Sequence, residues 1–421
     1  METVTRRTFL STSALSTTAA VAQEPKLRLG IIGCGWYGLV DWNAAVKCGG
    51  VEVAAICDLD SAHLAEATAE IEKKQSSKPK QFKNYSDLLA MDNLDAVIIA
   101  TPPHWHALPF IAACKRGVAI YEEKPLSYDV REGQAMIAAQ KKAGNIVQIG
   151  FQRRTSDAVH QARDYIRSGA AGRIVQADVQ IHYTASPLDN RPQDPPSTLD
   201  WETWCGPAPK LPYSPNIAHK AWRLEEAYGN GHLVDWGIHM IDATRYILGE
   251  GIPKRVTAVG GLYEYKGRIT TPDTLTAHFE FDTCPVVWRH RIWGAVEYSP
   301  EVSNGIFFFG EKETIFVTDQ RWMILPKGRD AQKKVTDSQP PVDLGQRHMA
   351  DFLAAVRAKT QPAVSPEDGW RSTTTVQLAM ISYKTGRSVS FDSQTAAIVN
   401  DEAANKLLMR PYRAPYQHPY V

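Results

Sequence analysis

A glycine-rich turn at residues 33–38, with the sequence GCGWYG, directly follows an apolar segment at residues 26–32. The pattern G-x-G-x-x-G between a strand and a helix is typical of a dinucleotide-binding fold. Its first glycine permits a tight turn, its second lets the backbone approach a pyrophosphate, and its third lets helix and strand pack closely. The free N–H groups at the start of the helix would bind the phosphates. We therefore assign five residues of the turn to a cofactor site: Gly33, Gly35, Trp36, Tyr37 and Gly38.

Strand-like and helix-like segments alternate over the first third of the chain. This alternation predicts an α/β Rossmann domain with a doubly wound parallel sheet, which we place at residues 23–150. The 421 residues of the chain are more than one domain usually holds, so a second domain is expected. The predicted strands lie at residues 26–32, 51–57, 96–100, 118–121 and 146–149, and the predicted helices include 61–74 and 107–116.

The second half of the chain has a different pattern. It predicts an α+β domain with a mostly antiparallel open sheet at residues 151–395, followed by a tail at residues 396–421. A stretch with eight prolines at residues 184–220 is too long and too rich in proline to be a helix or a strand, and long loops of this kind are usually functional. The predicted helices lie at residues 157–168 and 234–248, and the predicted strands at 174–183, 255–262, 274–281, 286–293 and 305–309.

Asp58 ends the second predicted strand, about 25 residues after the glycine turn begins. A carboxylate at this position hydrogen-bonds the hydroxyls of the adenosine ribose and repels a 2′-phosphate. The cofactor is therefore expected to be NAD, with NADP left open. Asp60 is an alternative for the same role.

Composition limits the classes of partner. The formal net charge of +1 gives no reason to expect a nucleic acid, and no apolar run after residue 25 is long enough to predict a membrane span. The six cysteines form no C-x-x-C pair, and two of them lie within the nucleotide-binding elements, so a disulfide framework is not expected.

The first 22 residues are not expected to belong to the fold. Arg6 and Arg7 precede a weakly apolar stretch that ends in Ala20-Val21-Ala22, the order found in a twin-arginine export signal. We therefore expect cleavage after residue 22 and a periplasmic or otherwise exported protein.

Three further motifs follow predicted strands or open a predicted helix. Residues 101–106 (TPPHWH) and 122–125 (EEKP) each follow a strand, and residues 235–242 (DWGIHMID) open the later helix. Together with the glycine turn, these motifs resemble the Gfo/Idh/MocA family, which includes glucose–fructose oxidoreductase and inositol dehydrogenase. The resemblance implies oxidation of a sugar, polyol or glycoside hydroxyl by a nicotinamide cofactor.

The resemblance also implies roles for individual residues. Lys124 of the EEKP motif would lie beside the nicotinamide, before a proline whose peptide bond is often cis in the family. Asp235 and His239 would reach the substrate carbon from the other domain. Further cofactor contacts are assigned to Thr101, Pro102, His104, His106, Glu123, Lys124 and Pro125, although a structural role for the two histidines is equally open.

The chemistry of alcohol oxidation explains these residue types. Removing a hydride and a proton from a carbinol requires a group of near-neutral pKa to take the proton, which suits His239. Asp235, one helical turn earlier, would orient the imidazole or bind a hydroxyl, and Lys124 would act on the substrate oxygen. No metal is predicted, because no third ligand accompanies Asp235 and His239 by spacing.

Other residues of the second domain are assigned to substrate binding. Trp201, Trp204 and Trp222 would stack on a sugar, although packing is the commoner role of a tryptophan. Asp242 continues the polar face of the helix and is equally well a surface charge. The substrate set is Arg153, His182, Trp222, Arg223, Asp235 and His239, with Arg154, His219 and His232 as further candidates.

Export would restrict how the cofactor is supplied and regenerated, because the periplasm contains no pool of free nicotinamide cofactor. The cofactor would be tightly bound and regenerated in place, either by a second sugar or by reversal of a transient oxidation. The alternatives are therefore an NAD-dependent glycoside hydrolase, acting by transient oxidation and elimination, and a non-catalytic nucleotide-binding sensor. The strand-rich region 255–310, with Phe307 to Phe309, predicts a homodimer or homotetramer.

Overall fold

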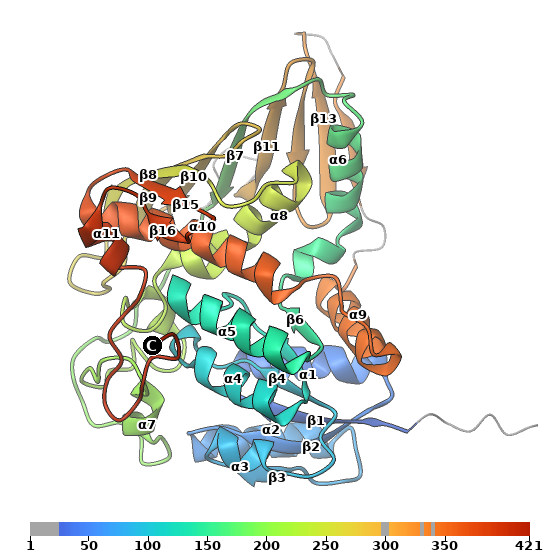
Figure 1. Ribbon diagram of the computed structural model, residues 1–421, viewed down its shortest axis with the longest axis vertical. Helices are drawn as coiled ribbons and strands as arrows, with labels where there is room; N and C mark the ends of the chain where they lie inside the picture. Colours follow the sequence, from blue (N-terminus) through green and yellow to red (C-terminus); the bar gives the residue numbers. More distant parts are fainter. Residues whose placement is uncertain (1–24, 296–302, 329–331, 338–341) are drawn as a thin grey trace, which may run out of the picture.

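The structure is a computed structural model that describes residues 25–295, 303–328, 332–337 and 342–421. The predicted export signal at residues 1–22 lies outside the described residues. The chain forms two sheets in different parts of the molecule, with helices α5 (Val130–Ala143) and α10 (Pro366–Thr385) between them (Figure 1). No helix within the described ranges has the length and apolar character that a membrane span requires.

The first sheet has six strands in the order β3-β2-β1-β4-β5-β6, and every neighbouring pair is parallel. The predicted Rossmann domain is therefore confirmed. Its central strands are continuous apolar runs because helices cover both faces of the sheet. Its strands are β1 (Leu27–Ile32), β2 (Val51–Cys57), β3 (Lys80–Phe82), β4 (Ala96–Ile99), β5 (Ala119–Glu122) and β6 (Val147–Ile149). Its other helices are α1 (Trp36–Cys48), α2 (Ser61–Glu72), α3 (Tyr85–Leu89), α4 (Ala107–Arg116) and the 3₁₀ turn η1 (Pro103–Trp105).

The second sheet has ten strands in the order β14-β13-β12-β11-β7-β10-β9-β8-β15-β16. Only β7 and β10 pair in parallel, so the predicted, mostly antiparallel α+β domain is also confirmed. The strands are β7 (Ile174–Ile181), β8 (Arg255–Gly261), β9 (Thr274–Glu280), β10 (Pro285–Arg291), β11 (Asn304–Gly310), β12 (Glu313–Val317), β13 (Arg321–Pro326), β14 (Lys334–Asp337), β15 (Val389–Asp392) and β16 (Ala397–Ile398).

The described helices that pack on this second sheet include α6 (Asp157–Arg167), α8 (Ile238–Leu248) and α10. Phe308 is fully buried against them, whereas its neighbours Phe307 and Phe309 point to the opposite face and remain half-exposed. This alternation follows from the two-residue period of a strand. The remaining helices are α7 (Trp201–Cys205), α9 (Leu344–Ala358), α11 (Glu402–Lys406), the 3₁₀ turns η2 (Gln152–Thr155) and η3 (Ala221–Leu224), and the π-helical turn η4 (Leu233–Gly237).

Two later segments return to the first domain. Helix α9 packs on α1, where Met349 and Phe352 share a cluster with Leu29 and Ala45. The end of the chain also folds back, because Arg410 contacts the buried carboxylate of Glu132. The sequence pattern did not indicate that residues after 340 would complete the Rossmann domain.

The proline-rich stretch is part of a longer, mostly irregular segment, residues 184–228. This segment lies beside the first domain (Figure 1). It has an apolar cluster of its own, in which Trp201 and Trp204 stack with ring centroids 4.8 Å apart. The indole of Trp201 donates to the carbonyl of Leu211. The two indoles therefore pack against each other, the commoner of the two roles expected for them.

Candidate active site

A cleft of about 1230 Å³ runs between the glycine turn and the second domain. One wall comes from the Rossmann domain and the other from residues 183–236. Cleft residues expected from the sequence are Gly33, Gly35, Trp36, Tyr37, Asp58, Thr101, Pro102, Trp204, His219, Trp222 and Arg223. The three predicted catalytic residues, Lys124, Asp235 and His239, are not among the residues that line it. Tyr183 and Trp236 also line it and were not predicted; Trp236 stands inside the DWGIHMID motif, but no sequence signal marked Tyr183.

The glycine turn has the geometry that its pattern predicts. Gly33 has a φ of +92°, and a Cβ on Gly38 would lie 2.0 Å from the carbonyl oxygen of Gly33. A Cβ on Gly35 would meet only the ring of His63, at 3.8 Å, so this position is open towards the cleft. No described side chain caps the start of α1, which leaves its first N–H groups free for phosphate oxygens.

Asp58 closes the turn from the end of β2. Its Oδ2 accepts from the backbone N–H of Cys34 at 2.7 Å, and its Oδ1 accepts from Asp60 at 2.9 Å. His63 Nδ1 lies 3.6 Å from Oδ2, and the Asp58 carboxylate raises the pKa of this imidazole. Asp58 thus both shapes the turn and faces the cleft, whereas Asp60 caps α2 through Ala62.

The EEKP motif brings Lys124 across to the second domain. Its Nζ donates to Asp235 Oδ1 at 2.9 Å and to the Asp235 carbonyl at 2.8 Å. The Lys124–Pro125 peptide bond is cis, the form that the family resemblance implied. Two residues assigned from separate motifs therefore meet at one point.

Asp235 serves two cations. Its second oxygen lies 3.0 Å from Nε of Arg223, whose guanidinium also stacks on Trp222 at 4.2 Å. Burial alone would raise the pKa of Asp235, but the charges of Lys124 and Arg223 hold that pKa below its usual value. Because each oxygen of Asp235 is paired with a cation, the carboxylate orients Lys124 and Arg223. The sequence analysis did not predict this relationship, since it expected Asp235 to support His239.

His239 lies on α8, just after the π-helical turn that carries Asp235. Burial lowers its pKa well below the usual value, and the nearby charges of Lys124 and Arg153 lower it further. Among the described residues, none hydrogen-bonds its Nδ1. The imidazole is therefore neutral at pH 7 and has one nitrogen without a protein partner, but its pKa is not the near-neutral one that the sequence argument expected of the proton acceptor.

The buried carboxyl group of Asp41, which lies near Glu123 and Lys124 of the EEKP motif, was not predicted. Asp41 on α1 is 3% exposed, and its pKa is raised by burial and by the charge of Glu123. Glu123 accepts from Gln152 Nε2 at 2.8 Å, and burial raises its pKa to about 7. An aspartate inside a helix gives no sequence signal that its side chain is buried against a motif 80 residues later.

The two histidines of the TPPHWH motif lie behind the cleft wall. His104 Nε2 lies 2.8 Å from the carbonyl of Trp204. The ring of His106 bridges the carbonyls of Thr101 and Pro125, each at 2.7 Å. Burial lowers the pKa of His104 to about 3 and that of His106 to about 4. These contacts favour the structural role that the sequence left open.

Several second-domain candidates also have structural partners. Asp242 accepts from Arg154 through both oxygens, at 2.7 and 2.8 Å, inside a buried network with Ser372. His182 Nδ1 accepts from the backbone of Arg291, and His232 Nε2 lies 3.1 Å from the Ile181 carbonyl. These residues support the site from behind.

Arg153 differs from these candidates. Its Nε pairs with Asp319 at 3.1 Å, while its buried Nη1 has no hydrogen-bond partner within the described ranges. Its charge also acts on His239, so it lies close to the proposed reacting centre.

Sequence profiles of one oxidoreductase family match three parts of the chain. The profile for the NAD-binding Rossmann fold of the Gfo/Idh/MocA oxidoreductase family matches residues 27–151. The profile for its C-terminal alpha/beta domain matches residues 296–418, and that for a further Gfo/Idh/MocA C-terminal domain matches residues 210–315. The chain belongs to the Gfo/Idh/MocA family of oxidoreductases. Its first domain is an NAD-binding domain, and NAD is its cofactor.

Curated relatives of this Gfo/Idh/MocA protein include several dehydrogenases. Myo-inositol 2-dehydrogenase of Thermotoga maritima is 24% identical over 82% of this chain and 92% of its own length. Levoglucosan dehydrogenase of Pseudarthrobacter phenanthrenivorans is 31% identical over 44% of this chain and 42% of its own length. A glycosyl hydrolase family 109 protein of Stenotrophomonas maltophilia is 28% identical over 64% of this chain and 63% of its own length. The match spans about half of some relatives, such as an uncharacterized oxidoreductase of Streptococcus pneumoniae at 55%.

Solved structures show the same fold. A levoglucosan dehydrogenase in complex with NADH and levoglucosan has a TM-score of 0.70 and 20% identity, over 87% of this chain and 99% of the other. An aldose–aldose oxidoreductase from Caulobacter crescentus, complexed with glycerol, has a TM-score of 0.68 and 20% identity, over 87% of this chain and 100% of the other.

Proposed function

We propose that this oxidoreductase transfers a hydride between bound NAD and a hydroxyl-bearing carbon of a sugar, polyol or glycoside. The observation that carries the proposal is the contact between Lys124 and Asp235, at 2.9 Å, where both domains meet beside the nucleotide cleft. NAD accepts the hydride when it is bound. The relatives that act on inositol and levoglucosan support a carbohydrate as the substrate class.

The residues of the chain would divide the remaining work. Lys124 donates a hydrogen bond to the substrate oxygen and stabilises the negative charge that develops there. Neutral His239 takes the hydroxyl proton. Asp235 keeps Lys124 and Arg223 in place, and the exposed indole of Trp236 offers a face for a sugar ring.

A carbohydrate panel tests the proposal. The purified protein with bound NAD is mixed with aldoses, cyclitols and glycosides, and reduction of the nicotinamide is followed by absorbance. We expect at least one class of carbohydrate to reduce the cofactor. If no carbohydrate reduces the cofactor and no glycoside is cleaved while NAD remains bound, the protein is a nucleotide-binding sensor.

A glycoside hydrolase that works by transient oxidation is the second candidate. The family 109 relative, which matches 64% of this chain, favours it. Release of the aglycone from aryl glycosides, without net change in NAD, would identify the hydrolase.

We also propose export and self-association. Export rests on the arginine pair at residues 6–7 and the Ala20-Val21-Ala22 end of the leader. Sequencing the N-terminus of protein recovered from a producing cell tests it, and Gln23 is expected as the first residue. Association rests on the partly exposed Phe307 and Phe309, whose rings stack 6.3 Å apart on the face of the second sheet opposite to Phe308.

A further inference from the structure

The irregular segment 184–228, here called the clasp, is bound to the first domain at the end of β2. The N–H of Ser61 donates to the carbonyl of Thr198, and the N–H of Asp200 donates to the carbonyl of Leu59, each at 3.0 Å. These two bonds lie next to Asp58, where the adenosine ribose of NAD is expected. The clasp is therefore bonded to the strand end that binds the adenosine half of the cofactor.

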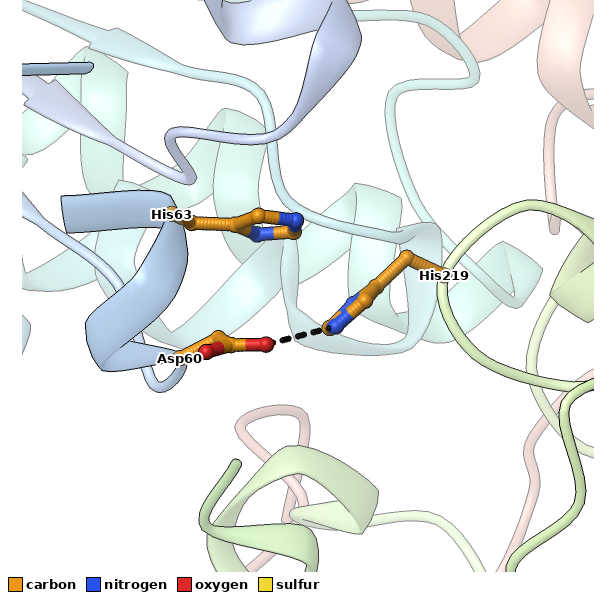
Figure 2. A group of neighbouring side chains, drawn as sticks. All are labelled: Asp60, His63 and His219. Carbon is orange, nitrogen blue, oxygen red and sulfur yellow. Dashed lines mark hydrogen bonds and ion pairs between the residues drawn. The ribbon is translucent and has the colours of Figure 1, made fainter. Parts of the chain in front are cut away.

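A side-chain contact strengthens this connection. Nε2 of His219 donates to Oδ2 of Asp60 at 3.0 Å, and its ring lies 4.2 Å from that of His63 (Figure 2). Burial raises the pKa of Asp60, but its hydrogen bonds to Ala62, Thr198 and His219 more than offset that effect, so the pKa is lowered. Burial lowers the pKa of His219. The contact is thus a hydrogen bond from a neutral imidazole to an ionised carboxylate, a stronger bond than one between neutral groups.

The middle of the clasp, at Trp204, is bonded to the loop after β4. The carbonyl of Trp204 accepts from the indole of Trp105 at 3.0 Å and also binds His104. The C-terminal tail then covers the clasp from outside. Arg413 donates to the carbonyls of Gly206 and Ala208, each at 3.1 Å.

Clasp and tail both reach the nucleotide cleft. The cleft is lined by Asp58 and Leu59 of the first domain, by Thr203, Trp204, His219 and Lys220 of the clasp, and by Tyr416 of the tail. The ring of Tyr416 also contacts Trp105 at 5.3 Å. A nucleotide seated on Asp58 would therefore lie against residues of the first domain, the clasp and the tail.

We infer that the clasp, fastened by the Asp60–His219 hydrogen bond and covered by the C-terminal tail, keeps NAD bound through successive turnovers. This inference rests on the proposed function in one respect. If the cofactor does not leave, the hydride taken from the first carbohydrate must pass to a second carbonyl compound in the same cleft. That compound gains the hydride at carbon and a proton at oxygen, becomes an alcohol, and returns the cofactor to NAD⁺.

The same three side chains also resemble a metal site. The ligand atoms of Asp60, His63 and His219 lie within 4.8 Å of one another, and two nitrogens with one oxygen would suit zinc. The geometry favours the hydrogen bond, because Asp60 already shares its two oxygens between His219 and the cap of α2. A bound metal is therefore an outcome that the test must detect.

The test measures exchange of bound NAD in the full chain. Purified protein is incubated with excess isotope-labelled NAD, and loss of the original nucleotide is followed by mass spectrometry. We expect exchange to be slow compared with turnover. His219→Ala and Asp60→Asn should each speed it by about tenfold or more, since both weaken a bond to a charged group. Asparagine can also cap a helix, so Asp60→Asn weakens the Asp60–His219 hydrogen bond while the cap of α2 is kept.

The exposed His278 of β9 supplies the control, and His278→Ala should leave exchange unchanged. Wild-type exchange that keeps pace with turnover, or variants that exchange as slowly as the wild type, would overturn the inference. So would one equivalent of bound metal whose removal by EDTA speeds exchange. The proposed function is judged separately, by reduction of bound NAD on adding a carbohydrate, so slow exchange without any reduction would refute the function and leave the clasp standing.

Discussion

Lys124 and Asp235 are 111 residues apart in sequence, yet Nζ of the lysine lies 2.9 Å from Oδ1 of the aspartate. The lysine follows a strand of the Rossmann sheet, and the aspartate stands on a π-helical turn of the second domain. Both side chains are largely buried, with 11% and 6% of their surfaces exposed. The pair therefore sets the distance between the two halves of the proposed site.

This arrangement predicts unequal costs of breaking the pair. Asp235→Ala leaves Lys124 and Arg223 without their shared carboxylate and should lower the free energy of unfolding by roughly 3–5 kcal/mol. Lys124→Ala leaves Asp235 with Arg223 and should cost less. Urea denaturation measures both, with the exposed Lys141–Glu367 pair as control, since Lys141→Ala should cost about 1 kcal/mol or less. Equal costs at Lys124 and Asp235 would show that the carboxylate does not serve two cations.

Buried histidines predict loss of stability in acid. Burial lowers the pKa of His106, His182, His232 and His348 to about 4 each, whereas the unfolded chain has the usual value near 6.5. The unfolded state therefore binds more protons between these values, so the stability present above pH 6.5 is lost as the pH falls towards 4. Calorimetry in buffers of different ionisation enthalpy should detect net proton uptake on unfolding at pH 5.5, because these four histidines bind more protons than Asp41 and Glu123, whose pKa values are raised in the folded state, release. Unfolding without proton uptake at that pH would contradict these directions.

Asp58 is expected to control both the turn and the choice of cofactor. Asp58→Ala removes the acceptor for Cys34 and Asp60 as well as the ribose contact, so affinity for NAD should fall roughly tenfold to a hundredfold. Affinity for NADP should remain poor, because the turn is disturbed as well. Calorimetric titration of cofactor-free protein measures both. Unchanged NAD affinity would remove Asp58 from the cofactor site.

The partly exposed Phe307 and Phe309 on the second sheet predict a homodimer or homotetramer. Placing a charge on this sheet face, as in Phe307→Glu, should shift the protein towards monomer, because a charge at the centre of an apolar interface loses its hydration. Light scattering at micromolar concentration measures the mass against the 46.8 kDa of one chain. Val421→Glu, at a position 91% exposed, is the control and should not change it. A wild-type monomer would refute the interface.

Local patterns predicted the parts of the fold that depend on nearby residues. The strand, glycine turn and helix around Gly33 are set by residues within one supersecondary unit, and the structure has them in that order. The return of α9 and of Arg410 to the first domain depends on contacts between residues hundreds of positions apart, for which no local pattern exists. A single sequence therefore indicated the domains but not how the chain end completes them.

The site shows the same division. The motifs placed Lys124, Asp235 and His239 near each other, but only the structure shows that Asp235 pairs with Lys124 and Arg223. The H-x-H pattern of His104 and His106 was ambiguous because a buried histidine and a cleft histidine follow a strand in the same way. Asp41 was missed because its burial depends on the EEKP motif, which lies in the same domain but about 80 residues later in the sequence.

Single-turnover reduction of bound NAD tests the central proposal most directly. A carbohydrate that reduces the cofactor in the wild-type protein is mixed with the Lys124→Ala and His239→Ala variants, and the absorbance of reduced nicotinamide is followed. We expect both variants to retain NAD and to reduce it roughly 10²–10⁴ times more slowly, the usual contribution of a general acid or base. Reduction at the wild-type rate in either variant, with NAD in place, would contradict the assignment of that residue to the reaction.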